Sequence, residues 1–334
     1  DDKDTILYLM ERGMISQSLQ DYETSSQDWR KAVDKDELLE TYSVSQGAAS
    51  LLANDLVLSF RGEPFERTLL FAFLAKNYLA QHNWDYAAIC ARNIIRHLDN
   101  NDGFPDIPYG RYMAGFCLEM INDRGNAAIQ YKTAAQLRPE LLLEEKSGQL
   151  SFRDAPATLP IPARKDWPCE LVCFVLIGRS PRGLHQAGSG LARDKAPYAE
   201  IYHAQDYLGR SYPLDNTAQL IADTAQRTAL IELAKTTTRM AVKVGVAQAV
   251  KQQSDSLGFF TELLLFSMER PDTRRWETLP LWLEVARLPC PANPEELKVI
   301  FKDGAQRTLG ARELGRPLAR RGKIYFTFCR DLFP

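Results

Sequence analysis

The sequence predicts an α+β protein in two parts: an all-helical repeat array at residues 1–150 and an α+β domain at residues 168–334. Three observations support this. Apolar residues recur every three or four positions in the first part, as one face of a helix requires. Short apolar runs bounded by proline or glycine, typical of buried strands, appear in the second part. The length of 334 residues favours two domains of about 100–200 residues each.

The first part repeats one pattern of small and aromatic residues. Ala114 and Gly115 allow two helices to approach closely, Tyr131 fills the groove beside them, and Pro139 ends the second helix. Two earlier units fit the same frame, one with Phe71, Leu74, Ala75, Tyr78, Trp84, Ala87 and Ile94, the other with Leu9, Gly13, Tyr22, Ser25, Trp29 and Ala32. Three units in one frame favour a tetratricopeptide-like (TPR-like) array over a generic helical bundle. With the periodic segment at residues 36–60, we expect seven or eight helices.

The second part begins where the helical periodicity ends. Prolines without periodicity predict a proline-rich linker at residues 151–167. Strands are then expected at Glu170–Ile177, Gln219–Thr224, Leu281–Leu288, Glu296–Phe301 and Lys323–Arg330. Two longer helices are expected between them, at Ala225–Gln252 and Leu257–Glu269. Strands around a helical middle predict a mainly antiparallel sheet.

Charge and cysteine content exclude some classes of function. The net charge is −2, so no overall field draws this chain to nucleic acid. A basic cluster near the end is interpreted as a solvated loop between strands; it consists of Arg307, Arg312, Arg316, Arg320, Arg321 and Lys323. Cys169 and Cys173 share a strand face about 13 Å apart, too far to bridge each other. The sequence allows one disulfide within the second half, and no cysteine has the spacing of a zinc site.

No motif predicts catalysis. None of the four histidines forms a HExxH motif or a neighbouring pair. The glycine-rich stretch Gly178–Gly190 follows a predicted strand but matches neither GxxxxGK[ST] nor GxGxxG. We therefore predict a non-enzymatic protein without cofactor, metal site or catalytic residue. The alternative is an enzyme that uses this loop with His185 or His203.

Two sets of residues are candidates for interaction. TPR arrays offer a concave surface to extended peptides or partner helices, and polar residues on that face are Asn77, Gln81, Arg111 and Glu119. A second candidate is the string 272–280. There Asp272 is expected to brace the turn, Trp276 to fill a gap between helix and sheet, and Arg274 or Arg275 to pair with Asp272 or Glu277. Tryptophan and arginine are also the residues that binding hot spots favour.

Several strings together resemble a known family: YLMERG at residues 8–13, FRGEPFE at 60–66, LAKNYL at 74–79, the strand followed by GRSP, and PDTRRWETLP at 271–280. They are similar to poorly characterised bacterial envelope lipoproteins with N-terminal TPR repeats. The resemblance covers nearly the whole chain. It implies export through a lipoprotein signal and anchoring by an acylated N-terminal cysteine, which this form lacks.

The resemblance also implies a location and a role. A periplasmic protein, an outer-membrane lipoprotein in its precursor, is expected, with membrane contact only through the lipid anchor. Its expected partners are other envelope proteins, peptidoglycan-synthesis or secretion components among them, and not nucleic acid. The sequence thus predicts a protein-binding scaffold in envelope assembly. A structural subunit of a larger envelope or secretion assembly is the second hypothesis.

Overall fold

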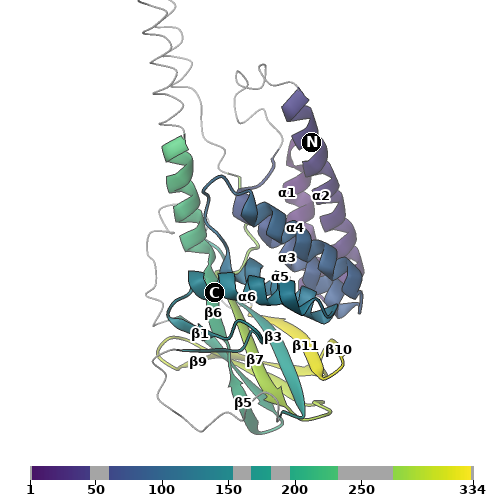
Figure 1. Ribbon diagram of the computed structural model, residues 1–334, viewed down its shortest axis with the longest axis vertical. Coiled ribbons are helices and arrows are strands. Elements are labelled where there is room, and N and C mark those ends of the chain that lie inside the picture. The colour runs from purple at the N-terminus through teal and green to yellow at the C-terminus, as the bar shows by residue number, and fades with distance from the viewer. Residues whose placement is uncertain (1, 46–59, 153–166, 182–195, 232–273, 332–334) are drawn as a thin grey trace, which may run out of the picture.

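The computed structural model describes residues 2–45, 60–152, 167–181, 196–231 and 274–331. Helices fill the first half and strands most of the second, so the protein has the predicted α+β fold with an N-terminal TPR-like array (Figure 1). After a short 3-10 helix at Asp2–Asp4, the array contains α1 (Thr5–Ser18), α2 (Tyr22–Ser45), α3 (Pro64–Ala80), α4 (Trp84–Asp99), α5 (Pro108–Met120) and α6 (Arg124–Leu137).

The six helices form three helix–turn–helix units of the same geometry. Each turn contains one residue in the left-handed backbone region, at φ angles of 64°, 59° and 67°. These residues are Gln20, His82 and Asn122, seven positions after Gly13, Ala75 and Gly115 of the repeat frame. His82 therefore lies in the turn of the second unit.

Close helix approach within a unit depends on the small residues. A Cβ atom added to Gly13 would lie 2.3 Å from Nε1 of Trp29, and one added to Gly115 would lie 2.9 Å from the Tyr131 ring. Contacts below 3.0 Å between such atoms are not tolerated, so each glycine is required by the aromatic residue that faces it from the second helix.

We expect Gly13→Ala to destabilise the protein by about 1–3 kcal/mol, because the Trp29 ring must move or the helices must separate. Gly125→Ala is the matched control, since nothing lies within 4 Å of its added Cβ. Alanine is a better helix former than glycine by about 1 kcal/mol, so the control should be neutral or stabilising. Urea unfolding measures both; equal losses in the two variants would contradict the close packing.

The periodic segment at residues 36–60 is helical as far as residue 45, because α2 runs without a break from Tyr22 to Ser45; residues 46–59 lie outside the described part. One element of the helical half is new. After α6 the chain forms a small antiparallel hairpin, β1 (Leu141–Leu143) with β2 (Leu150–Phe152), which the sequence did not predict.

Two sheets make up the second half. The strands are β3 (Cys169–Ile177), β4 (Tyr198–His203), β5 (Asp206–Arg210), β6 (Tyr212–Asn216), β7 (Trp282–Cys290), β8 (Leu297–Lys302), β9 (Thr308–Gly315), β10 (Ala319–Arg321) and β11 (Ile324–Arg330). One sheet has the order β10-β11-β3-β7-β6 and the other β5-β4-β8-β9. Among the described strands only β11 and β3 pair in parallel, so the sheets are mainly antiparallel as predicted.

Two sequence interpretations are wrong in this half. The strand expected at Gln219–Thr224 belongs to a helix over residues 217–231, whose first amides at Ala218 and Gln219 donate to the Asn216 side chain. The basic cluster is not a single loop, because Arg312, Arg320 and Arg321 lie on β9 and β10, while Arg307, Arg316 and Lys323 lie in the turns beside these strands. Of the longer helix expected at Ala225–Gln252, residues 225–231 are helical, and the rest falls outside the described residues, as does the helix expected at Leu257–Glu269.

Strand β3 lies at the centre of a three-layered arrangement. Its residues Val172 and Phe174 face a hydrophobic core shared with the helices, while Leu171 and Cys173 face a second core between the two sheets. Both faces of β3 are therefore buried, which explains its unbroken apolar run. The first core contains residues from both halves of the chain. The domain boundaries expected around residues 151–167 therefore stay a prediction. No helix in the described part of the chain is long and apolar enough to cross a membrane.

Candidate functional site

One side of α5, a helix that carries two of the expected contact residues, is covered by the protein's own sheet. On α5, the rings of Tyr109, Tyr112 and Phe116 lie 5.7, 6.1 and 5.6 Å from that of Phe174 on β3. Phe116 also stacks on Phe326 of β11 at 5.9 Å. Figure 1 shows the five-stranded sheet directly against α5 and α6. This side of α5 is therefore an internal interface.

A buried ion cluster ties the array to the sheet. The guanidinium group of Arg287, on β7, is fully buried and donates to Glu170 on β3 at 2.7 Å and to Glu119 on α5 at 2.9 Å. It also donates to the Tyr131 hydroxyl on α6 at 3.0 Å. Glu119, an expected partner-contact residue, thus holds an internal cation.

Asn77 and Gln81 also have internal partners. Asn77 is buried between α1, α2 and α3, where it accepts from Gln17 at 2.7 Å and donates to Ser25 at 2.8 Å. Gln81 is half-buried and donates to Ser26 at 3.3 Å. These contacts link the first repeat to the second.

Arg111 is the fourth expected contact residue, and it too is engaged within the fold. Its guanidinium group lies 2.8 Å from Asp99 and 2.9 Å from Asp106, and it donates to Gln130 at 3.2 Å. The structure brings none of the four together into an exposed surface, so a role in partner binding stays a prediction for them.

The second candidate, the string 272–280, packs against the helical array through its described residues. Trp276 is buried, with its ring 6.1 Å from that of Trp29 and 5.6 Å from that of Phe73, and its amide donates to Glu66 at 2.8 Å. Burial raises the pKa of Glu66 to about 7. Arg274 pairs with Asp4 at 2.5 Å. These contacts hold residues 274–278 against the array.

Fewer contacts are described for the other residues of this string. One buried guanidinium nitrogen of Arg275 has no hydrogen-bond partner among the described residues. The amide of Glu277 donates to Glu11 of α1 at 2.6 Å. Asp272 lies outside the described residues.

The glycine-rich loop is described only at its start. Gly178 has a φ of 70° after β3, and the buried Ser180 donates its amide to Leu279 at 2.7 Å. This part of the loop therefore supports the Trp276 segment. His203 ends β4, and His185 lies outside the described residues.

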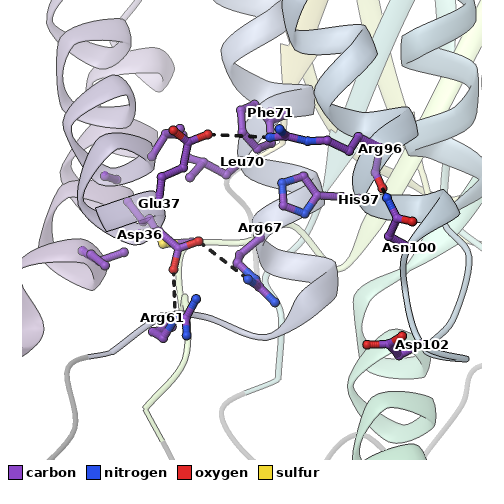
Figure 2. Close-up of a pocket in the computed structure, with 14 residues that line it drawn as sticks. Asp36, Glu37, Arg61, Arg67, Leu70, Phe71, Arg96, His97, Asn100 and Asp102 are labelled. Atoms are coloured by element: carbon purple, nitrogen blue, oxygen red, sulfur yellow. Dashed lines mark hydrogen bonds and ion pairs between the residues drawn. The ribbon is translucent and has the colours of Figure 1, made fainter. Parts of the chain in front are cut away.

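A pocket of about 750 Å³ opens between the first and second repeats (Figure 2). Its apolar wall comes from α1, α2 and α3 and includes Leu70 and Phe71. His97 and six charged residues surround that wall: Asp36, Glu37, Arg61, Arg67, Arg96 and Asp102. Residues from four helices, from the segment before α3 and from the segment after α4 thus meet here, which no local sequence motif indicated.

The ion pairs of this pocket are longer than those that hold the fold. Arg61 and Arg67 approach Asp36 at 3.3 and 3.7 Å, and Arg96 approaches Glu37 at 3.6 Å. The pairs of Arg111 and Arg287 measure 2.7–2.9 Å, the usual range of charge-assisted hydrogen bonds. One buried nitrogen of Arg67, its Nε, has no hydrogen-bond partner in the described part of the protein. The pocket arginines therefore have donor capacity available for a ligand.

Among the described residues, no group of three or more His, Cys, Asp or Glu side chains is arranged to hold a metal ion. No protein-family model matches the chain, and no curated protein matches it. A solved structure titled "MamA AMB-1" is similar at 17% identity, over 42% of this chain and 76% of that chain, with a TM-score of 0.18. A likeness at that score carries no argument, so the site rests on this chain's own geometry.

Proposed function

We propose that this protein is a non-enzymatic scaffold of the bacterial cell envelope that binds an acidic segment of a partner protein in the pocket between its first and second repeats. The observation that carries the proposal is the set of loosely paired arginines around an apolar wall. The lining includes no hydroxyl or thiol nucleophile among its described residues, which favours binding over catalysis.

The chemistry of the pocket favours carboxylate side chains beside an apolar one. A guanidinium group has five donors in a planar fork that matches a carboxylate, and pairs beyond 3 Å leave those donors poorly used. An incoming carboxylate gains hydrogen bonds from Arg67 and Arg96, while an apolar neighbour fills the space against Leu70 and Phe71. A cavity of this size falls in the range of about 300–1,000 Å³ that ligand sites occupy.

The envelope location belongs to the proposal as well. It is supported by the resemblance of several strings, YLMERG and PDTRRWETLP among them, to TPR-containing envelope lipoproteins. Under this proposal the protein works in the periplasm. A lipid on an N-terminal cysteine of the full-length form anchors it to the outer membrane. Its partners are envelope proteins, with peptidoglycan-synthesis and secretion components as the first candidates.

Retention of a defined protein from envelope extract tests the proposal. The full chain is the correct bait, because removing the sheet would expose the apolar face of α3 and α5 and bind proteins unspecifically. We expect Arg96→Gln to weaken retention of the partner by about 10-fold or more, since a hydrogen bond to a charged group contributes about 1.5–3 kcal/mol. Arg96 is 57% exposed, so the substitution leaves folding intact.

Arg124→Gln is the matched control, an exposed arginine on α6 outside the pocket. Retention should be the same as for the unmodified chain. Equal retention by the Arg96 and Arg124 variants would move the binding site away from the pocket. If neither the variants nor the unmodified chain retained a protein, the scaffold proposal would be wrong.

A further inference from the structure

Four cysteines gather in the core between the two sheets. Cys169 and Cys173 lie on the same face of β3, Cys290 lies on β7 and Cys329 on β11. All four are buried free thiols. The scaffold role uses none of them, and their strand register decides which can react together.

Cys169 and Cys290 stand directly opposite each other in the antiparallel pair of β3 and β7. The register between these strands runs without a bulge from this pair to Ile177 and Trp282. Opposed residues of antiparallel strands have Cα atoms about 4.5 or 5.5 Å apart. Disulfides need a Cα separation of about 4.4–6.8 Å. Both side chains also enter the same core, so their Cβ atoms point to the same side of the sheet.

Cys173 and Cys329 are not directly opposite each other. In the parallel pair of β3 and β11, Cys329 stands opposite Val175, two residues beyond Cys173. Strand spacing and rise place the Cα atoms of the two cysteines about 8 Å apart, beyond the reach of a disulfide. Contact with the Cys329 thiol, together with burial, also holds the pKa of Cys173 well above its usual range. This second pair therefore stays reduced.

We propose that Cys169 and Cys290 form a disulfide when the chain folds in an oxidising compartment. The oxidant is a disulfide of the glutathione or oxidoreductase class. One cysteine thiolate attacks a sulfur of that disulfide and releases the first thiolate; the other then attacks the mixed disulfide and releases the second. The two protein thiols are oxidised to one disulfide, and the oxidant is reduced to two thiols. The two protons that the protein thiols lose pass to the thiolates released from the oxidant.

The bridge closes a long loop over residues 170–289 and fixes the end of β3 to the end of β7. Glu170 and Arg287, which join the sheet to the array, lie within three residues of it. A disulfide across a long loop stabilises by limiting the unfolded chain. In the cell the proposal rests on the export that the proposed function includes, because the cytosol keeps such thiols reduced.

The test is to refold the full chain in a buffer of reduced and oxidised glutathione, block free thiols in denaturant and determine masses. We expect four of the six cysteines to be blocked, and one cross-linked peptide to contain Cys169 and Cys290. The oxidised protein should melt roughly 5–10 °C higher than the reduced protein. The Cys173→Ser/Cys329→Ser variant should keep the bridge and the gain in Tm, whereas Cys169→Ser should lose both. Six blocked thiols after refolding, or a bridge that includes Cys173 or Cys329, would overturn the proposal.

A second arm separates this proposal from the scaffold proposal. Thiols are blocked in intact cells before the protein is extracted. A Cys169–Cys290 bridge in that sample supports both the disulfide and export, whether or not a partner is retained on the pocket. Six blocked thiols from cells, despite a bridge after refolding, would overturn both the bridge in the cell and the export that it needs.

Discussion

Replacing Arg287 with methionine is expected to lower the free energy of unfolding by about 3–5 kcal/mol, one of the two largest losses we predict for one substitution. Methionine retains much of the side-chain volume but removes the cation that Glu170 and Glu119 share at 2.7 and 2.9 Å. The Arg287 side chain is 0% exposed and the two carboxylates are 6% and 12% exposed, so water cannot replace it. Urea unfolding with intrinsic fluorescence gives the loss directly.

Arg307→Met is the control for this substitution. Arg307 pairs with Asp303 at 2.7 Å, a similar distance, but its side chain is 82% exposed. Exposed pairs contribute about 0–1 kcal/mol, so the control should change stability little. If Arg287→Met lost less than about 1 kcal/mol, the ion cluster would not be what joins the array to the sheet.

The second large effect is expected from Trp276→Ala, at about 3–5 kcal/mol. The substitution empties a site between the rings of Trp29 and Phe73, 6.1 and 5.6 Å away, and the backbone around it cannot collapse while its amide is held by Glu66. The loss should appear as a lower urea midpoint with an unchanged slope.

Trp84→Ala provides the comparison, because Trp84 is only partly buried at the start of α4. Its loss should be less than half that of Trp276→Ala, since the cost rises with the cavity left behind. Equal losses would mean that the segment 274–278 does not depend on Trp276 for its contact with the helices.

Local patterns predicted the repeat units well. The pairs Gly13 with Trp29 and Gly115 with Tyr131 lie sixteen residues apart in both units, so one helical hairpin brings each pair together. Strand β3 was predictable for a similar reason, because burial on both faces demands an unbroken apolar run.

Features that depend on distant residues were not predictable. Strand β5 is exposed or half-buried throughout, so it has no apolar alternation to indicate it, and β4 finds its partner β8 far along the chain. The helix at 217–231 was misread because Leu220 and Ile221 resemble the start of a strand when the cap at Asn216 is not recognised.

The candidate site shows the same limit. The predicted contact residues Asn77 and Arg111 were chosen from their helical positions, but both are buried by contacts within the helical array. The pocket needs Asp36 from α2 beside Arg67 from α3, and Glu37 beside Arg96 from α4. Nothing in the local sequence of either partner indicates these pairs.

Photo-cross-linking from the pocket tests the scaffold proposal most directly. A photoreactive residue replaces Asn100, which lines the pocket and is exposed, and in a second protein it replaces the exposed Lys132 of α6. In intact cells we expect one defined envelope protein to be linked to position 100, to be lost when Arg96→Gln is added, and not to be linked to position 132. Labelling of the same protein from position 132 alone, or no labelling from position 100, would contradict a binding site between the first two repeats.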